Sequence, residues 1–516
     1  MSQGFDYTQL TSFERFMITV AVMAATVMQV LDTTITSVAL PYMAGDLGAS
    51  PDQISWVLTS YLVASAIIMP LTGYFTDKFG QREYLMFSVA LFVVASALCG
   101  ISQNLLEIIG FRLLQGIAGA ALVPLSQAIM VQVFPPDQRG KAMAIWGIGV
   151  MVGPILGPTI GGWLTQAIEW RWTFYINLPV GLFALAAIGR FAPRLPRKAG
   201  RTMDWLGFTL LALAIGGTQY VLDRGNQDNW FDSPVIVSAA IIAVVSGLFF
   251  LWLSFVPNRR PVFSLAIFRD RNFTLANGIM MLMGLGMFGA IYVQPLMLER
   301  EMGYPILTTG LVLAPRGIAS MIAMMIIGRI INFVDIRLII GFGIFLSLVG
   351  SWGMMQYNLD IDTWQVIWPL LFQGAGIGMI FVPLSTIAFS TLAPQFAAEA
   401  AGLYSLIRTV GSSIGISIVA TLVSRHAQAA WNQLGGGITL DNPLTWQYLA
   451  PLHLAPNSPT GAAILSQTLM SQSDMLAYHD AYVLIFASFV VMVPVVLAFR
   501  AESKARSTPR PAAASE

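Results

Sequence analysis

The sequence predicts an all-α protein that crosses a membrane many times, and three observations support this fold class. Of the 516 residues, 56% are hydrophobic and only 10% are charged, whereas soluble domains carry roughly 25% charged residues. Fourteen apolar stretches are long enough to cross the roughly 30 Å hydrocarbon layer as helices that rise about 1.5 Å per residue. An internal repeat also relates the first part of the chain to the last.

Polar turns separate the fourteen predicted spans, whose boundaries hold to within a few residues. In chain order the spans fall at about 14–41, 53–75, 83–101, 105–134, 142–165, 172–192, 205–222, 234–256, 273–298, 306–331, 337–356, 364–392, 398–424 and 481–499. The formal net charge is +1, and no concentrated basic region accompanies it. We therefore expect no nucleic-acid partner, and we expect the lipid bilayer to surround most of the chain.

The internal repeat is clearest in two runs of sequence. FRLLQGIAGAALVPLSQAIMVQVFPP begins at Phe111 and PLLFQGAGIGMIFVPLSTIAFSTLAP begins at Pro369, an offset of about 258 residues. Both runs contain Gln-Gly, then Val-Pro-Leu-Ser, then a later proline. A second set of matches pairs Gly153 and Gly157 with Gly411 and Gly415. Because repeats of this kind build the halves of many transporters, we infer two six-helix bundles with an inserted helix pair at about 205–256.

This repeat sets the expected domain organisation. The N-terminal six-helix bundle covers 1–198, and the inserted pair with its basic linkers covers 199–262. The C-terminal six-helix bundle covers 263–500 and includes an outer segment at 425–480. The remaining tail at 501–516 is rich in Ala, Ser and Pro and is expected to be disordered.

Basic residues predict the orientation, because Lys and Arg accumulate in cytoplasmic loops. Most of the 27 basic residues flank the spans on the side where the chain begins. The opposite side holds only Arg171, Arg224, Arg300 and Arg425. Both termini are therefore expected in the cytoplasm. The first apolar run is too long for a signal core and follows no basic region, so we expect an uncleaved first span.

A glycine and proline series stands out in the fifth span, in the run GVMVGPILGPTIGGW. It comprises Gly149, Gly153, Pro154, Gly157, Pro158, Gly161 and Gly162. Glycines four residues apart form a smooth stripe that lets another backbone approach closely, and each proline removes a backbone donor. The series predicts a bent, closely packed helix. It either serves transport or is simply a packing seam between helices.

One acid and one base lie at similar depth in the first half. Asp32 is about nine residues, or roughly 13 Å of helical rise, from the outer end of the first span. Arg112 lies about seven residues into the fourth span. An uncompensated carboxylate at this depth would be neutral. If Arg112 pairs with it, an arriving proton would break the pair and switch the protein between two states. A permanent salt bridge that locks two helices is the alternative.

Other polar residues are candidates for a cavity between the halves. Gln29, Thr33 and Thr36 share one face of the first span with Asp32. We assign Gln115 and Gln373, the glutamines of the repeated Gln-Gly, to the same cavity.

Arg316 and Arg408 lie near the middle of spans ten and thirteen, where the second half offers no carboxylate except Glu399. A buried guanidinium without an anion invites an anionic ligand. We therefore hypothesise that substrates include amphipathic weak acids whose carboxylate or phenolate meets one of these arginines. Backbone carbonyls or Gln373 are the alternative partners.

The sequence offers little for catalysis or cofactor binding. Cys99 is the only cysteine, which excludes an intrachain disulfide. The three histidines, His426, His453 and His479, lie in the outer segment without metal-ligand spacing, as expected of a solvated loop. No nucleophile motif and no GxxxxGK[ST] phosphate loop occurs, which argues against an enzyme and against direct use of ATP. Residues 460–480 are predicted to form a helix that joins the last span.

The chain resembles the fourteen-helix drug/proton antiporters of the major facilitator superfamily, and within them the EmrB-type exporters. The resemblance covers nearly the whole chain. It is carried by LDTTITSVALP at 31–41, GYFTDKFGQR at 73–82, RLLQGIAGAALVP at 112–124, the Gly149–Gly162 series, and LDRG with a following tryptophan at 222–230. The resemblance implies the major facilitator fold and proton-driven export of hydrophobic compounds, with no cofactor.

The resemblance also implies roles for the motif residues. Asp32 and Arg112 would couple proton entry to export, mainly within the first half. The glycine and proline series would be the antiporter motif. Gly73, Asp77, Gly80 and Arg82 form the turn between the second and third spans, where a carboxylate can accept from a helix N-terminus across the bundle and latch the outward-open state. Ordinary turn chemistry is the alternative for these four.

EmrB-type pumps work in the bacterial inner membrane with a membrane fusion adaptor and an outer-membrane channel, so the resemblance implies both partners. The outer segment could cap the cavity or contact such an adaptor. Two alternatives stay open: an exporter dedicated to one metabolite, such as a siderophore or a fatty acid, and a polytopic membrane protein that is not a transporter.

Overall fold

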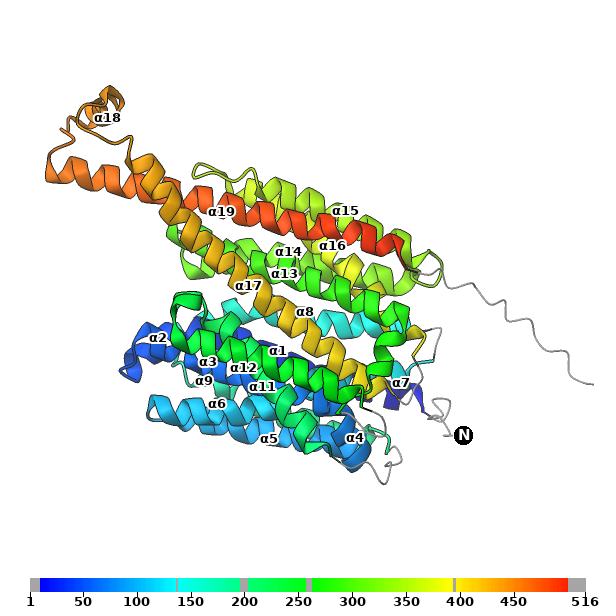
Figure 1. Ribbon diagram of the computed structural model, residues 1–516. Coiled ribbons are helices and arrows are strands. Elements are labelled where there is room, and N and C mark those ends of the chain that lie inside the picture. Colours follow the sequence, from blue (N-terminus) through cyan, green and yellow to red (C-terminus); the bar gives the residue numbers. More distant parts are fainter. Residues whose placement is uncertain (1–9, 136–137, 195–202, 257–261, 393–395, 500–516) are drawn as a thin grey trace, which may run out of the picture.

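The structure is a computed structural model that describes residues 10–135, 138–194, 203–256, 262–392 and 396–499 (Figure 1). Every regular element in these ranges is a helix. Fourteen helices, some built from consecutive shorter pieces, are long and apolar enough to cross a membrane. The sequence prediction of an all-α, fourteen-span fold is therefore confirmed. The predicted tail at 501–516 and parts of both basic linkers lie outside the described residues.

The first half contains six spans. Its elements are α1 (Ser12–Asp46), α2 (Pro51–Ile54), α3 (Trp56–Ile68), η2 (Met69–Leu71), α4 (Thr72–Phe79), α5 (Gln81–Ile101), α6 (Leu105–Gly119), α7 (Leu122–Val133), α8 (Arg139–Ala167), α9 (Trp172–Tyr175) and α10 (Asn177–Phe191). The second span combines α3, η2 and α4, the fourth combines α6 and α7, and the sixth combines α9 and α10. Side chains cap several of these helices; Asn104, for example, accepts from the backbone of Glu107 at the start of α6.

The inserted pair consists of α11 (Trp205–Arg224) and α12 (Pro234–Ser254), joined through η4 (Trp230–Asp232). The elements of the second half are η5 (Leu265–Arg269), α13 (Arg271–Arg300), α14 (Ile306–Ile330), α15 (Ile336–Met354), α16 (Thr363–Ser390), α17 (Ala397–Gly435), α18 (Pro443–Leu449), η7 (Ala450–Leu452) and α19 (Pro459–Leu497). Figure 1 shows the two groups of long helices side by side, with α11 and α12 against the first half.

The glycine series of α8 packs directly on α1. A Cβ atom added to Gly153 would lie 2.8 Å from the carbonyl carbon and oxygen of Val30. The same relation occurs in the second half, where a Cβ on Gly411 of α17 would lie 2.8 Å from the carbonyl oxygen of Met281 in α13. Only glycine allows two backbones to approach this closely. The predicted close packing and the predicted glycine correspondence between the halves are both present, while the bend of α8 stays a prediction.

The two halves contact each other along α8 and α14, and also at the ends of the helices on the side where α1 begins, here called the N-terminal side. A Cβ added to Gly73 of α4 would lie 2.8 Å from the Cβ of Glu399 in the first turn of α17. A Cβ on Gly402 of α17 would lie 2.7 Å from the carbonyl oxygen of Met69. Nearby, Gly140 of α8 lies under Ile331 at the end of α14. These contacts bring the halves together on the N-terminal side.

The outer segment is more helical than the sequence predicted. α17 continues as one helix to Gly435, well beyond the expected end near 424, and α19 begins at Pro459. The predicted helix at 460–480 that joins the last span is therefore confirmed. The two extensions project beyond the bundle and carry α18 at their tip (Figure 1). A cavity of about 460 Å³ lies between them, lined by side chains that include Trp431, Leu465 and Leu469.

Two of the three histidines lie on these helices rather than in a loop, which corrects the sequence interpretation. His426 of α17 contacts Asp480 of α19, with 2.7 Å between Nδ1 and Oδ2. His479 lies 3.6 Å from the other oxygen of Asp480. Within the described ranges no group of three or more His, Cys, Asp or Glu side chains could hold a metal ion.

Candidate functional site

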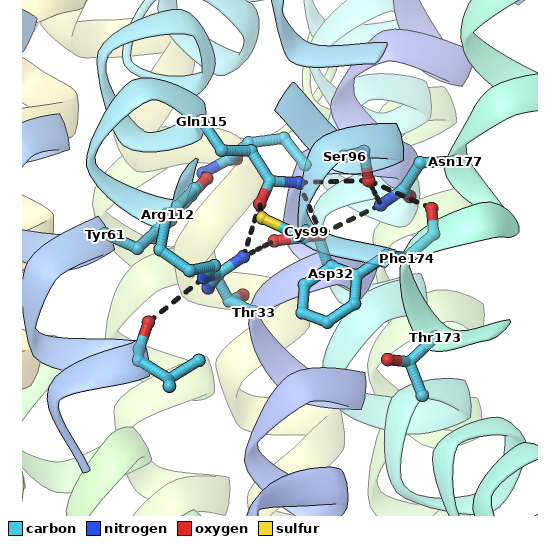
Figure 2. A network of polar contacts seen from close by, with 12 residues as sticks. Asp32, Thr33, Tyr61, Ser96, Cys99, Arg112, Gln115, Thr173, Phe174 and Asn177 are labelled. Carbon is cyan, nitrogen blue, oxygen red and sulfur yellow. Dashed lines mark hydrogen bonds and ion pairs between the residues drawn. The ribbon is translucent and has the colours of Figure 1, made fainter. Parts of the chain in front are cut away.

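Asp32 and Arg112 form an ion pair in the interior of the first half (Figure 2). Arg112 Nη1 lies 2.5 Å from Asp32 Oδ2, and both side chains are completely buried. Asp32 belongs to α1 and Arg112 to α6, so the pair joins two spans. A buried ion pair must be held by further hydrogen bonds to offset the desolvation of both charges.

Amide and hydroxyl groups supply those hydrogen bonds. Gln115 Nε2 and Asn177 Nδ2 each donate to Asp32 Oδ1 at 2.8 Å. Gln115 Oε1 accepts from Arg112 Nη1 at 2.7 Å. Both amides also donate to Ser96 Oγ, which in turn donates to the carbonyl oxygen of Phe174 (Figure 2). Both oxygens of the carboxylate therefore accept hydrogen bonds, from donors on two helices, α6 and α10.

Arg112 has contacts beyond the carboxylate. Its Nε donates to the carbonyl oxygen of Val57 at 3.0 Å, and its guanidinium carbon lies 4.3 Å from the centre of the Tyr61 ring. A cation over an aromatic face is stabilised by the ring quadrupole. Arg112 Nη2 is buried and makes no hydrogen bond with a described residue.

The sequence pointed to Asp32, Arg112 and Gln115 but missed Ser96, Tyr61 and Asn177. Asn177 is 2% exposed at the start of α10 and bonds Asp32 directly. A signal for Ser96 was available, because Ser351 stands about 255 residues later, close to the repeat offset. Nothing in the sequence singled out Asn177 or Tyr61, since polar residues near the ends of spans are common.

The three other polar residues predicted on the face of α1 do not join this network. Gln29 donates to the Tyr61 hydroxyl at 3.0 Å and so contacts the network only at its edge. Thr33 donates to the carbonyl of Val30 in its own helix. Thr36 is fully buried, and its hydroxyl makes no hydrogen bond with a described residue.

The polar candidates of the second half remain apart from the ion pair. Arg316 is 8% exposed, and its buried Nε has no partner among the described residues. Gln373 is fully buried and donates to Ser351 Oγ at 3.4 Å. Arg408 is half-buried on α17, one turn after Tyr404.

The predicted turn between the second and third spans joins α4 to α5. Gly80 has φ = 93°, a backbone conformation that favours glycine. Arg82 donates to the carbonyl oxygen of Gly189 in α10. In the second half Arg337 donates in the same way to the carbonyl oxygen of Phe499, after α19. This pair of matching contacts agrees with the repeat.

The inserted helix α11 contacts both halves, a role that the sequence did not indicate. Its Asp223 accepts a hydrogen bond from Thr59 of α3, and Arg224 Nη1 donates to Ser55 Oγ at 2.6 Å. Towards the second half, Gln219 Nε2 donates to Ser413 Oγ of α17 at 2.6 Å. Beyond α11, Trp230 Nε1 donates to Thr421 Oγ1 of α17 at 3.0 Å.

Two glycine-packed helix bundles that contact each other, the first with a buried acid–base pair in its interior, define a multi-spanning membrane transporter. A family comparison matches residues 22–416 to the Major Facilitator Superfamily. The chain belongs to this superfamily, and its curated relatives make it an EmrB-like member.

Three relatives cover most of the chain. The Fatty acid resistance protein FarB of Neisseria gonorrhoeae is 34% identical over 501 residues, which is 95% of this chain and 97% of FarB. The Multidrug export protein EmrB of Escherichia coli (strain K12) is 34% identical over 93% of this chain and 94% of its own length. The Probable multidrug resistance protein EmrY of the same strain is 36% identical over 84% and 85%.

Solved structures agree on the fold. The human organic anion transporter MFSD10 matches with a TM-score of 0.58 at 14% identity, over 92% of this chain and 99% of MFSD10. A double-tryptophan mutant of XylE also matches with a TM-score of 0.58 at 14% identity, over 94% and 96%. At this level of identity the likeness concerns the arrangement of the helices.

Proposed function

We propose that this protein exports hydrophobic or amphipathic compounds in exchange for protons, by alternating access between the two bundles. The observation that carries the proposal is the Asp32–Arg112 pair, which is completely buried between α1 and α6. A charged pair at this depth is costly and usually marks an ion or substrate pathway. The relatives named as multidrug export proteins support the same function.

The pair is a two-state element. With Asp32 ionised, Arg112, Gln115 and Asn177 all donate to its carboxylate. A proton on Asp32 removes the charge that holds the guanidinium, so Arg112 can turn away and α6 can shift relative to α1. One charge moving across 100 mV is worth about 2.3 kcal/mol, which shifts such an equilibrium tens-fold.

Contacts on the N-terminal side would form the gate. Gly73, Asp77, Gly80 and Arg82 act as the latch in this proposal, with Gly73 seated against Glu399 of the other half. The smooth stripe of α8 allows α1 to slide while keeping contact, which is the role proposed for the glycine and proline motif. In this proposal the substrate contacts the polar residues that the sequence assigned to a cavity: Gln29, Thr33, Thr36, Gln115, Arg316, Gln373 and Arg408.

The proposed setting is the bacterial inner membrane, with both termini in the cytoplasm as the basic residues predict. The outer segment would then project on the periplasmic side. We propose that it contacts a membrane fusion adaptor of the EmrA type, which passes substrate to an outer-membrane channel. Exposed apolar side chains at the tip, among them Leu444 at 68% and Tyr448 at 52%, favour a protein partner there.

Reconstitution tests the proposal. Purified protein in liposomes is given a hydrophobic fluorescent dye and an imposed pH gradient, with and without a membrane potential. We expect dye to accumulate against its gradient only while the proton gradient lasts, and a protonophore to collapse it. Equal dye movement with and without the gradient would exclude proton coupling.

A second candidate is an exporter dedicated to fatty-acid-like compounds, favoured by the similarity to FarB over 97% of that relative. The same liposomes distinguish the two. A dedicated exporter moves medium-chain fatty acids but leaves structurally unrelated dyes in place, whereas a multidrug exporter moves both.

A further inference from the structure

The polar centre of the first half has a structural counterpart in the second half. In the first, Gln115 Nε2 donates to Ser96 Oγ at 3.2 Å, across α6 and α5. In the second, Gln373 Nε2 donates to Ser351 Oγ at 3.4 Å, across α16 and α15. Both glutamines belong to the repeated Gln-Gly. The repeat therefore reproduces the amide and hydroxyl part of the site.

The glycines that follow these glutamines identify the next matching position. A Cβ on Gly116 would lie 2.5 Å from the carbonyl oxygen of Tyr61 in α3. A Cβ on Gly374 would lie 2.0 Å from the carbonyl oxygen of Arg316 in α14. Arg316 thus occupies the position in the second half that Tyr61 occupies in the first. Tyr61 stacks on the cation of the first half, whereas Arg316 is itself a cation.

The charges of the two centres differ. The guanidinium in the first half is neutralised by Asp32. Arg316 is 8% exposed and makes no hydrogen bond or ion pair within the described part of the chain. The titratable side chains that face it are the phenols of Tyr357 and Tyr482, whose rings pack edge to face at 5.4 Å. Both hydroxyls are engaged elsewhere, with the carbonyl of Val366 and the sulfur of Met297.

The polar centre of the second half also contains an unpaired hydrogen-bond acceptor, which does not contact Arg316. Gln373 Oε1 is buried without a partner, although Arg316 lies on the adjoining helix at the same level. A buried guanidinium binds a carboxylate in a bidentate manner, with charge-assisted bonds stronger than those to a neutral amide. The second half thus has the donors of the first site without its carboxylate.

From this mirrored arrangement we propose that the carboxylate or phenolate of an amphipathic substrate binds Arg316, taking in the second half the place that Asp32 takes in the first. The amide of Gln373 donates to the same group. This inference rests on the proposed export function and deepens it by assigning the residue that recognises the anionic group of a substrate. The apolar part of the substrate would lie along Met and aromatic side chains, which adapt to varied shapes.

Equilibrium binding tests the inference separately from transport. The probes are radiolabelled dodecanoate and dodecanamide, which share a chain and differ in charge, with the protein in lipid nanodiscs at pH 8. For Arg316→Gln we expect at least a tenfold loss of dodecanoate affinity and dodecanamide affinity within twofold of the wild type. Arg316→Lys should keep part of the dodecanoate affinity. Equal loss for both probes, or loss of dodecanoate affinity in Arg408→Gln instead, would overturn the assignment.

Two further measurements complete the test. Thermal unfolding without ligand should show Arg316→Gln at least as stable as the wild type, because an uncompensated buried cation is removed; clear destabilisation would mean that Arg316 is already satisfied within the fold. Replacing chloride with gluconate should leave dodecanoate affinity unchanged within twofold. If chloride competes for the site and dodecanoate does not bind there, a halide is the ligand and the substrate assignment is wrong. Uptake of a neutral dye driven by a pH gradient reports on the export function independently.

Discussion

Arg112 Nη1 lies 2.5 Å from Asp32 Oδ2, and Gln115 hydrogen-bonds to both side chains. The glutamine therefore holds acid and base in register, and all three are completely buried. A change in the charge of Asp32 therefore alters its interactions with two residues on one face of α6, Arg112 and Gln115.

Asp32→Asn should abolish uphill transport. The amide keeps the shape of the site but cannot exchange a proton, so proton-driven dye accumulation should fall to the level of empty liposomes. Downhill exchange of dye between the two sides should persist. Asp46→Asn, at the exposed end of the same helix, is the control and should retain accumulation. Full uphill transport by Asp32→Asn would disprove the coupling scheme.

Gly153→Ala should weaken the packing of α8 on α1. The added Cβ would lie 2.8 Å from the backbone of Val30, which cannot move as a flexible side chain would. Overpacking of this kind costs about 1–3 kcal/mol, so the melting temperature in detergent should fall along with transport. Gly278→Ala in α13 meets nothing within 4 Å and should be neutral or slightly stabilising.

Gly73→Ala should loosen the contact of the halves on the N-terminal side, because the added Cβ would lie 2.8 Å from the Cβ of Glu399. A reporter cysteine at Ser405, which is 1% exposed on α17, should then react faster with a water-soluble maleimide. The native Cys99 is fully buried and gives little background. Unchanged labelling together with lost transport would argue against a gate at this contact.

The hydrogen bond from Gln219 to Ser413 should couple α11 to the second half. A double-mutant cycle with Gln219→Leu and Ser413→Ala should give a coupling energy of about 1 kcal/mol, measured by thermal unfolding. Transport rates should change in the single variants without loss of substrate binding. Strict additivity of the two substitutions would mean that the bond contributes nothing.

Stability should depend on pH through Glu301, which follows the end of α13. Burial raises the pKa of Glu301, and the neighbouring Asp474 raises it further, partly offset by a hydrogen bond with Ser471. A raised pKa means that the ionised form is disfavoured in the folded state, so its destabilising effect is present above the folded pKa and disappears as pH falls below the unfolded value of about 4.3. Glu301→Gln should therefore raise the melting temperature at pH 8 but not at pH 4. Asp441→Asn, at an exposed position, should show no such difference.

The sequence predicted the helices well because a helix that crosses a membrane must be long and apolar over its whole span, and both properties can be read from the sequence. The depth of Asp32 and Arg112 followed from counting residues along two helices of known rise. Their exact partners did not follow, because Asn177 reaches Asp32 from the sixth span and only packing brings them together.

The internal repeat relates more positions of the two halves than could be matched from the sequence alone. It located the glycine stripes and the two Gln-Gly pairs. It did not show that Arg316 takes the position of Tyr61, since the two residues differ in chemistry and are matched only through the backbone contacts of Gly374 and Gly116. The end of α17 was underestimated because its extension is too polar for lipid yet still helical.

The attachment of α11 to both bundles bears on how shorter members could arise from this architecture. Excising 205–256 would remove the side-chain hydrogen-bond partners that this segment supplies to Thr59, Ser413 and Thr421. A twelve-helix derivative would need to repack the surfaces around those three positions as well as delete the segment. The inserted pair is thus an integral part of the fold, because side chains of both bundles form hydrogen bonds with it.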